Sequence, residues 1–568
     1  MSSSLSVLLV YFSASPTAAR WASPTAGRFE LTLHLESTWS AAQLDSLFWD
    51  VATPGSQRYL NFLSLEDLAS KVGSKDVVIA AATAFLQETL HGKVTHVSPL
   101  RHIITASFEP PDSEMRHLWT ARGMPKAHLV PPGVDLVTRR DFGLLAPPPP
   151  AQRRRSHHDT PDGAYSVAAQ KKAYQVPAAL AATNPATTQM VWGPGTFGFS
   201  RDALRDFARE ECPNLNVDKV LYDTAHHGVP GGDNFGEGTL DTHMTAAFGL
   251  NATTIVSNTN TSMSTEESDG FGLAMLDFIT ELAGRPQVPH VLSLSLGSLS
   301  AYSCDLLCSE AAKTGDVTLA ECRSYLEKQR QVCMFQSTAQ MDKINAALMA
   351  LGLRGVSIFG SSGDGGSHWS FGPFEGFGKV PRTLNKVGCA FNFPIFPSPS
   401  PYMVSVGGTE WDGLDPTKPV MWRGSGGGFS WSAPMPSHQA AAVGNYLHAT
   451  SGLPPPSSFN ASGRAYPDIA AVAVDGTSQS SPVFAGLFTL LIDARLNAGL
   501  KPLGFVAPRI YQVAQAFPNE AFEDVTVGNS KTTCESGFPA AKGWDPTTGW
   551  GRPVWPGLVK HFASDDTL

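Results

Sequence analysis

The stretch that decides the fold is Asp475-Gly476-Thr477-Ser478-Gln479-Ser480-Ser481-Pro482, followed by the apolar run 483–488. Glycine before a small hydroxyl residue lets the backbone turn sharply, and Pro482 is tolerated in the first turn of a helix. We therefore predict a turn that leads into a helix, with Ser478 at the helix N-terminus, where unpaired N–H groups favour a developing negative charge. This geometry suits a serine nucleophile with an oxyanion hole. The pattern differs from the G-x-S-x-G nucleophile elbow, and a plain Ser/Thr-rich helix cap fits the same residues.

The composition indicates a large, mildly acidic globular protein. Its 568 residues suggest two or more domains. Charged residues make up 16% of the chain, below the roughly 25% that is usual. The net charge of −9 argues against nucleic acid as a partner. No run approaches the roughly 20 apolar residues that a membrane span needs.

Charge and histidine are unevenly distributed along the chain. Residues 20–160 are near neutral, so the acidic excess lies elsewhere, and 8 of the 16 histidines lie between His34 and His158. Because histidine changes its charge between about pH 5 and 8, a histidine-rich segment could separate from an acidic body as the pH falls. Ordinary surface histidines are the alternative for each residue taken singly.

The cysteines and sequons fit a secretory route. None of the 7 cysteines lies in the first 200 residues and no C-x-x-C pair is present, so a zinc site is not expected. Four cysteines within residues 304–333 can form two local bridges, and the odd total leaves one thiol over. The apolar run 5–12 and the small residues after it resemble a signal peptide, assigned to residues 1–19, although a basic n-region is lacking. Three glycosylation sequons begin at Asn251, Asn260 and Asn460.

Residues 20–146 are predicted to form a compact α+β domain. Residues 29–35 alternate apolar and polar side chains as a half-buried strand does, residues 41–51 and 65–72 have helical spacing, and residues 94–108 hold two more strand-like pieces. A unit of about a hundred residues is a usual domain size.

Residues 147–164 differ from both neighbours. They contain a run of prolines, three consecutive arginines and two histidines, and they show no apolar period. This composition predicts a linker, and exposed basic linkers are where proteolytic nicking concentrates. We place a processing region here.

From residue 165 to residue 568, short apolar strands alternate with helices. Strands are predicted at residues 217–222, 254–257, 291–296, 355–359 and 402–406, and helices at 271–282, 338–351 and 483–498. Alternating βαβ units imply an α/β fold, with a parallel sheet and helices on both faces. Active sites of such sheets lie at the carboxyl ends of the strands.

Three carboxylates are candidates for catalysis. Glu237 and Asp241 are four residues apart on a predicted helix and therefore share one face. Two close carboxylates cannot both ionise easily, so one pKa rises and that group can act as a general base in acid. Asp364 lies in a Gly-rich loop directly after the strand predicted at 355–359, where a neutral carboxyl could donate a hydrogen bond to an oxyanion. A solvated helix N-terminus and a plain Asp-Gly turn are the alternatives.

Two further aspartates lie in turn-rich loops near the C-terminus. Asp524 and Asp545, together with neighbouring backbone carbonyls, supply the oxygen ligands that calcium prefers. A plain turn is the alternative.

In chain order, these motifs resemble the sedolisin family of serine-carboxyl peptidases. The resemblance covers residues 165–563 strongly and reaches the first domain through residues 58–66. The motifs that carry it are Glu237-x-x-x-Asp241, Ser-Gly-Asp364-Gly, Val406-Gly-Gly-Thr409, Gly426-Gly-Gly-Phe-Ser430, Ala465-Tyr-Pro-Asp468, Gly-Thr-Ser478-x-Ser-x-Pro and Gly543-Trp-Asp-Pro-x-Thr-Gly-Trp-Gly551.

The resemblance implies a subtilisin-like fold in which a glutamate stands where subtilisins have histidine. Ser478 would attack the peptide carbonyl, and Glu237 would take its proton and later pass it to the leaving amine. Asp241 would orient Glu237 and share its proton. The side chain of Asp364 and the backbone N–H of Ser478 would form the oxyanion hole.

The family's single structural calcium ion is also implied. Its ligands would be the side chains of Asp524 and Asp545 and the backbone carbonyls of Val525, Ala541 and Gly543.

The implied activity is that of an acid-active serine peptidase that releases tripeptides from the free N-termini of peptides and unfolded proteins. Residues 20–146 would be an inhibitory propeptide, removed autocatalytically in acid. The implied location is the lysosome or an equivalent acidic vacuole, or outside the cell. The alternatives are a sedolisin-type endopeptidase and an inactive homologue that acts as a binding protein.

Two features depart from the family pattern. Only four residues separate Ala471 from Gly476, where relatives have a longer stretch with its own hairpin, so either the gene model lost an exon or the substrate cleft is trimmed. Either outcome bears on activity and specificity more than on the fold. His368 stands near the place where relatives have a bridge-forming cysteine, so Cys389 is expected to pair with Cys534 instead.

Overall fold

The computed structural model describes residues 28–564, apart from 111–114, 121–122, 142–162, 196, 225–235, 260–269, 329–331, 336, 369–377 and 475. The signal peptide predicted at residues 1–19 and nearly all of the linker predicted at residues 147–164 lie outside the described residues.

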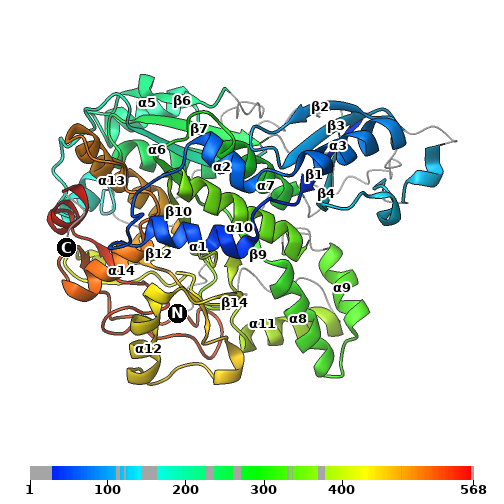
Figure 1. The fold of residues 1–568 in the computed structure, drawn as a ribbon. Helices are drawn as coiled ribbons and strands as arrows, with labels where there is room; N and C mark the ends of the chain where they lie inside the picture. Colours follow the sequence, from blue (N-terminus) through cyan, green and yellow to red (C-terminus); the bar gives the residue numbers. More distant parts are fainter. Residues whose placement is uncertain are drawn as a thin grey trace.

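A mostly parallel sheet forms the centre of the larger domain (Figure 1). Within the described ranges it has eight strands in the order β13-β12-β10-β8-β5-β7-β6, with β16 paired to β12. Every pairing is parallel except that of β12 with β13. The α/β fold with a parallel sheet is therefore confirmed. The strands are β5 (Thr188–Pro194), β6 (Val220–Tyr222), β7 (Thr253–Thr259), β8 (Val291–Leu294), β10 (Ser357–Ser361), β12 (Val404–Trp411), β13 (Pro419–Met421) and β16 (Ile469–Val472).

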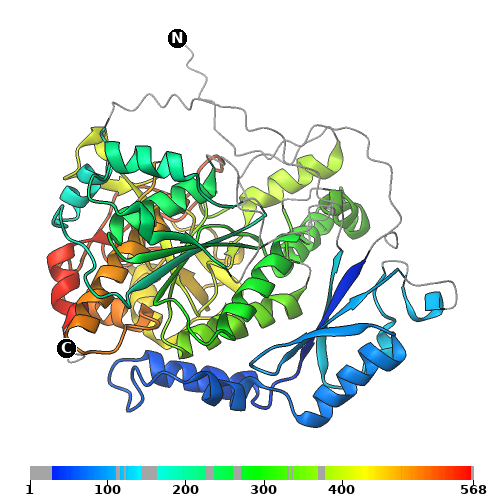
Figure 2. The same cartoon turned by 90° about the horizontal axis from the view of Figure 1, so that it is seen from above.

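Helices cover both faces of this sheet (Figure 2). On one face α6 (Glu237–Phe248) and α13 (Thr477–Asn497) pack together, and on the other α7 (Gly270–Ala283) packs with α10 (Thr338–Leu353). In the part of the chain that is described, no helix has the length and apolar character to cross a lipid bilayer.

Aromatic side chains join the sheet to its helices. Phe359 of β10 lies 5.0 Å, between ring centroids, from Phe488 of α13. Trp192 of β5 stacks at 5.0 Å on Phe278 of α7. All four rings are essentially inaccessible to solvent, so the two helical layers bury large apolar areas against opposite sheet faces.

The N-terminal domain is a four-stranded antiparallel sheet with the strand order β2-β3-β1-β4. Its core combines this sheet with α3 and excludes α1 and α2. The elements are β1 (Phe29–Leu35), β2 (Lys93–Val97), β3 (Ile103–Phe108), β4 (Val134–Asp141), α1 (Ala41–Ala52), α2 (Leu65–Val72) and α3 (Asp76–Ala84).

Helices α1 and α2 lie along the large domain rather than in the N-terminal one (Figure 1). Phe48 of α1 contacts Tyr402 and Phe505 of the large domain, each at 5.1 Å between ring centroids. The Leu63 N–H, just before α2, donates to the Leu353 carbonyl at the end of α10 (2.8 Å). The prediction that residues 20–146 form one compact unit is therefore wrong for these two helices, because their apolar faces are buried against the large domain.

The remaining elements surround the two sheets. They are α4 (Val167–Ala173), α5 (Arg201–Glu210), α8 (Ala301–Lys313), α9 (Leu319–Lys328), α11 (Lys379–Ala390), α12 (Ala440–Ala449), α14 (Ala507–Ala516), α15 (Trp555–Leu558), β9 (Ser298–Leu299), β11 (Ile395–Phe396), β14 (Gly428–Pro434), β15 (Gly463–Tyr466), β17 (Phe522–Glu523) and β18 (Arg552–Pro553).

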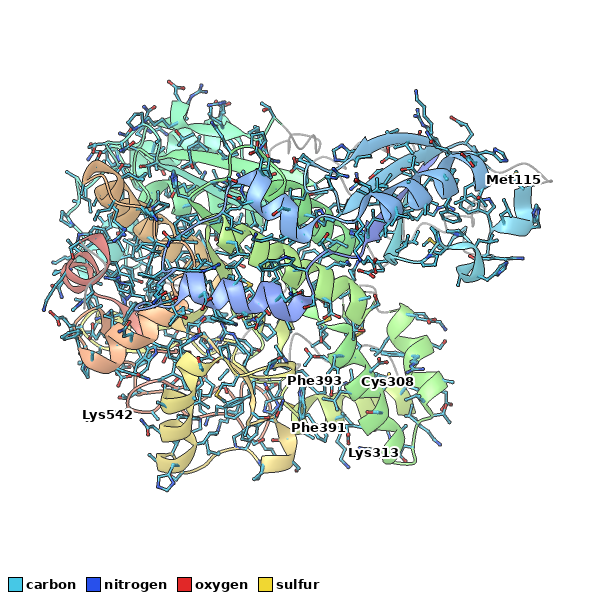
Figure 3. The ribbon with its side chains drawn as sticks, viewed as in Figure 1. Met115, Cys308, Lys313, Phe391, Phe393 and Lys542 are labelled. Atoms are coloured by element: carbon cyan, nitrogen blue, oxygen red, sulfur yellow. A yellow bond between two sulfur atoms is a disulfide. The ribbon has the colours of Figure 1, made fainter. Side chains whose placement is uncertain are left out.

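Three disulfides stabilise the large domain. Cys304–Cys333 and Cys308–Cys322 are the two local bridges, and Cys389 pairs with Cys534, as expected. The buried Cys212 is the thiol left over. The bridges at residues 304–333 enclose a separate small core, which contains Cys308 and Phe393 (Figure 3).

Candidate active site

Ser478 lies in the first turn of α13, as predicted from the sequence around it. The helix begins at Thr477, a few residues after the carboxyl end of β16, and the Ser478 side chain is half-buried. The prediction for Pro482 is wrong in detail, because this residue lies inside the helix rather than in its first turn. A proline at this position has no N–H to donate to the Ser478 carbonyl, four residues earlier. That carbonyl instead accepts a hydrogen bond from the Ser295 hydroxyl (3.3 Å).

Gly476 is required by the close approach of Asp364. Its φ is +152°, a conformation that L side chains rarely adopt, and a Cβ there would lie 2.9 Å from Asp364 Oδ2. The glycine therefore lets the carboxyl reach the start of α13.

Asp364 is attached to the helix start by two hydrogen bonds on one oxygen. The Thr477 N–H and hydroxyl both donate to Asp364 Oδ1, at 2.7 and 2.8 Å. Burial raises the pKa of Asp364, and the hydrogen bonds from Thr477 partly offset this rise. Because Oδ1 already accepts two hydrogen bonds, the proton of the neutral carboxyl belongs on Oδ2, where it is available to a ligand.

Glu237 and Asp241 share one face of α6, which packs directly against α13. Asp241 is fully buried, and neither of its oxygens, nor Glu237 Oε1, has a hydrogen-bond partner among the described residues. Burial raises the pKa of Glu237 to about 7, while its hydrogen bond with Ser478 acts to lower it. Burial and the neighbouring Glu237 raise the pKa of Asp241 well above its usual range. The pair therefore retains at least one proton in acid.

The four predicted side chains thus come together from separate parts of the chain. Ser478 faces Glu237, Glu237 faces both Asp241 and Asp364, and Asp364 holds the turn before Ser478. Analysis of the sequence missed Ser295, which touches this group. It could have been found, because it lies near the carboxyl end of the strand predicted at 291–296, and active sites of parallel sheets lie at the carboxyl ends of the strands.

The five predicted calcium ligands also lie in one place. Asp545 is fully buried and accepts from the Ala541 N–H (2.9 Å), and Asp524 Oδ2 accepts from the Gly543 N–H (2.7 Å). The Val525 carbonyl lies in the same region, where it accepts a hydrogen bond from the Thr548 hydroxyl (3.3 Å). Asp524 Oδ1 is buried without a partner, and burial raises the pKa of Asp545 to about 7.

This donor set fits a hard cation. Buried carboxylates are stable when they are paired or bind a metal, and calcium would satisfy the orphaned oxygen. Among the described residues no group of three or more His, Cys, Asp or Glu side chains is arranged to hold a metal ion, and a set of two carboxylates plus carbonyls does not need one.

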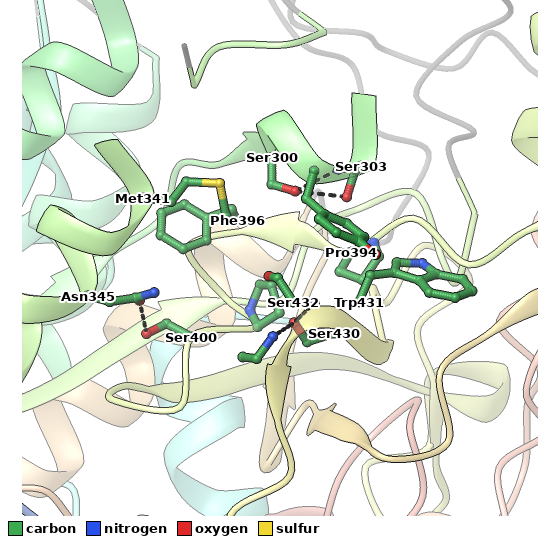
Figure 4. Close-up of a pocket in the computed structure, with 13 residues that line it drawn as sticks. Ser300, Ser303, Met341, Asn345, Pro394, Phe396, Ser400, Ser430, Trp431 and Ser432 are labelled. Atoms are coloured by element: carbon green, nitrogen blue, oxygen red, sulfur yellow. Dashed lines mark hydrogen bonds between the residues drawn. The ribbon is translucent and has the colours of Figure 1, made fainter. Parts of the chain in front are cut away.

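A small cavity of about 20 Å³ lies between the start of α8, α10, β11 and β14 (Figure 4). Trp431, Phe396 and Met341 supply its apolar walls, and Ser300 and Ser430 are among its polar groups. None of the four candidate catalytic side chains lines it.

The chain resembles the serine-carboxyl peptidases of the sedolisin family, and comparisons of its sequence with known proteins confirm that resemblance. Residues 19–109 match the Pro-kumamolisin activation domain. The chain is similar to tripeptidyl-peptidase 1 of Bos taurus, with 39% identity over 245 residues, and of Homo sapiens, with 38% over 247 residues. Each match covers 39% of this chain and 40% of the relative, so the matched part spans about two fifths of the relatives' length.

The chain is also similar to a solved structure, that of the sedolisin of Pseudomonas, a serine-carboxyl proteinase complexed with two molecules of pseudo-iodotyrostatin. The TM-score is 0.47 at 20% identity, and the match covers 68% of this chain and 95% of the sedolisin.

Proposed function

We propose that this chain is the precursor of an acid-active serine-carboxyl peptidase that releases tripeptides from free N-termini. One observation carries the proposal: Ser478, at the N-terminus of a buried helix, faces a buried carboxyl pair whose pKa values are raised. A hydroxyl beside a base, with preorganised donors at a helix N-terminus, is the arrangement that acyl transfer needs.

The proton inventory defines the proposed mechanism. Glu237, ionised while Asp241 holds the shared proton, accepts the Ser478 proton as Oγ attacks the peptide carbonyl. The oxyanion that forms accepts from the Ser478 N–H and from neutral Asp364 at Oδ2. Glu237 then gives its proton to the leaving amine, and water releases the acyl group by the same steps in reverse.

The proposed precursor has three parts: an inhibitory propeptide at residues 20–146, a processing linker at 147–164 and a catalytic domain at 165–568. The match of residues 19–109 to an activation domain supports the first part. The proposed substrates are peptides and unfolded proteins, and the proposed site of action is a lysosome, an equivalent acidic vacuole or the outside of the cell.

The tripeptidyl specificity predicts a clear substrate preference. After processing, the enzyme should cleave chromogenic tripeptide amides near pH 4 and spare the same amides when they are N-acetylated, because it requires a free N-terminus. Product masses and initial rates measure this. Equal cleavage of both forms would contradict the tripeptidyl proposal and favour an endopeptidase. No turnover of any peptide pool at acid pH would favour an inactive homologue.

We further propose one structural calcium ion held by Asp524, Asp545 and the carbonyls of Val525, Ala541 and Gly543. Chelation with EGTA should lower the melting temperature at neutral pH, and added calcium should restore it, because an ion that binds only the folded state stabilises it. The Asp524→Asn variant should lose this response. An unchanged melting temperature of the wild type in EGTA, with no bound calcium by mass spectrometry, would contradict the site.

A further inference from the structure

His368 is buried in the loop that carries Asp364, and both nitrogens of its ring contact backbone carbonyls. The exposed fraction of this histidine is 2%. Nδ1 lies 2.9 Å from the Phe391 carbonyl oxygen, and Nε2 lies 2.6 Å from the Ser536 carbonyl oxygen. Both distances are short enough for a hydrogen bond. The imidazole therefore bridges two segments that are distant from it and from each other in the sequence.

The chemistry of the two acceptors requires two protons on the ring. A carbonyl oxygen can only accept a hydrogen bond, so each ring nitrogen must carry a proton for both contacts to be favourable. Neutral imidazole has one N–H and one lone pair, whereas imidazolium has two N–H groups. In the neutral ring, one nitrogen lone pair would face a carbonyl lone pair in a buried site, where an unsatisfied group is costly. The geometry therefore fits the charged ring, whose bonds to the carbonyls are charge-assisted.

The charged side chains on the segments packed against the ring point into solvent. Lys386 lies on α11, and Lys531 and Glu535 lie in the loop that contains Ser536; all three are exposed. Asp364 lies four residues earlier on the histidine's own loop. The two carbonyls are thus the groups in direct contact with the ring nitrogens.

The ring attaches the Asp364 loop to two segments that a disulfide also links. Phe391 follows Cys389 by two residues, and Ser536 follows Cys534 by two residues. Cys389 and Cys534 form one of the three disulfides. The loop is therefore tied to a pair of segments that is already covalently fixed.

The residue before His368 extends this attachment toward Asp364. The Ser367 N–H and hydroxyl both donate to the Ser530 carbonyl, at 3.0 and 3.2 Å. The Ser367 carbonyl accepts from the side-chain amide of Asn392 (2.6 Å). The outer end of the loop is thus held by the same two segments throughout, and loosening of the histidine bridge frees that end.

We propose that His368 is a positioning residue: its imidazolium form clamps the outer end of the Asp364 loop in acid and releases it as the ring loses its second proton. This inference rests on the proposed peptidase function, in which Asp364 donates to the oxyanion. The charged ring makes two bonds and the neutral ring makes one, so the stability that the clamp adds is present at low pH and is lost as the pH rises. Histidine changes its charge between about pH 5 and 8. Only an N–H bond breaks, and the proton goes to solvent.

The test compares His368→Gln with a matched control, His290→Gln. The glutamine amide can donate to one of the two carbonyls, but its side-chain oxygen cannot donate to the other. The control histidine is partly buried, and its Nδ1 accepts from the Thr188 N–H at 3.3 Å, so a neutral ring satisfies that contact. Hydrogen exchange of residues 389–393 and 530–538 is measured in the Ser478→Ala precursor, and kcat and KM on a tripeptide amide are measured in the processed enzyme.

His368→Gln should speed exchange in these two segments about 10-fold at pH 5, as expected for loss of a hydrogen bond from a charged group. It should leave exchange nearly unchanged at pH 8, where the wild-type ring has also lost its second proton. At pH 4, kcat should be about 10-fold below the wild type with little change in KM, and this ratio should fall toward 1 near pH 7. His290→Gln should show no such dependence on pH in either measurement.

An effect of His368→Gln that is equal at pH 5 and pH 8, or absent at both, would overturn the proposal, because the bridge would then not depend on the charge of the ring. If His368→Gln does not fold, His368→Asn, a smaller neutral amide, must show the same dependence on pH. The exchange measurement needs no catalysis. Wild-type enzyme without peptidase activity would therefore overturn the proposed function and still leave the clamp tested, so the two failures are distinguishable.

Discussion

The Glu237→Gln variant should cleave a tripeptide amide with a kcat about 10²- to 10⁴-fold below the wild type, which is the usual contribution of a general base. Glutamine keeps the shape of the side chain but cannot accept the Ser478 proton. KM should change little, because Glu237 acts on the proton and not on the bound peptide. Steady-state kinetics at pH 4 measure both constants.

Ser478→Ala should have a larger effect. Removal of the nucleophile of such a site lowers kcat by about 10⁶-fold. Ser480→Ala is the matched control. Ser480 lies two residues further along α13 and donates to the Ala471 and Val472 carbonyls at 3.1 and 3.2 Å. It should cost stability and leave kcat near the wild-type value. Comparable kcat values for Ser478→Ala and Ser480→Ala would contradict the assignment of the nucleophile.

The second large effect concerns release of the N-terminal domain in acid. Strand β1 has two different faces. Phe29, Leu31 and Leu33 point into the core of the N-terminal domain, whereas Glu30 and His34 alternate with them and face the large domain. Separation of the two domains would therefore expose His34 to solvent.

Lys343 of α10 holds this contact together. Its Nζ donates to the Leu35 carbonyl (3.1 Å) and to Asp135 (2.6 Å), both in the N-terminal domain. Burial, and then the charge of Lys343, lower the pKa of His34 to about 3 and that of His102 to about 4. Both imidazoles are thus neutral while the domains are in contact.

The sign of the pH effect follows from these values. A histidine whose pKa is lower in the assembled state stabilises the assembly above its free pKa of about 6.5, and that stability is lost as the pH falls toward 4 or 3. At pH 4.5, two units below the free value, each histidine favours separation by about 2.7 kcal/mol relative to neutral pH. Two ion pairs, Lys343 with Asp135 and Arg140 with Asp277, also join the two domains.

Histidine variants should therefore separate at lower pH. The Ser478→Ala precursor should not cut itself, so hydrogen exchange of its α10 reports only the separation of the two domains. The pH at which α10 becomes half exposed should lie between 6.5 and 4. His34→Gln and His102→Gln should each lower that midpoint by about one pH unit, because one proton-uptake site is removed. His96→Gln is the control, since His96 is exposed on β2. A midpoint unchanged in both variants and in their combination would contradict the mechanism.

Local patterns singled out the candidate residues, and the match of their motifs, in chain order, to the sedolisin family implied their roles. The small residues before the apolar run predicted Ser478 at a helix N-terminus. The four-residue spacing predicted Glu237 and Asp241 on one helix face, and the strand before Asp364 predicted that carboxyl at the carboxyl end of the sheet. Each depends on a few neighbouring residues, and the rule that parallel strands end at one edge brings them together.

What the sequence could not predict depends on distant contacts. The spacing of α1 and α2 shows that one face of each is apolar, but not which domain covers it. Strands β5 and β16 were missed because their apolar runs are short and are accompanied by glycine, alanine or proline. Pairing with the neighbouring strands, β7 for β5 and β12 for β16, stabilises them. The position of Pro482 inside α13 is tolerated because Ser295, far away in the chain, supplies the missing donor.

The central claim is that Ser478 is activated by a carboxyl pair that holds one proton. The pH dependence of kcat/KM for the processed wild-type enzyme tests it most directly. We predict a bell-shaped profile whose activity disappears as the pH rises past about 7, the value to which burial raises the pKa of Glu237. Activity that stays constant or rises up to pH 9 would contradict the account.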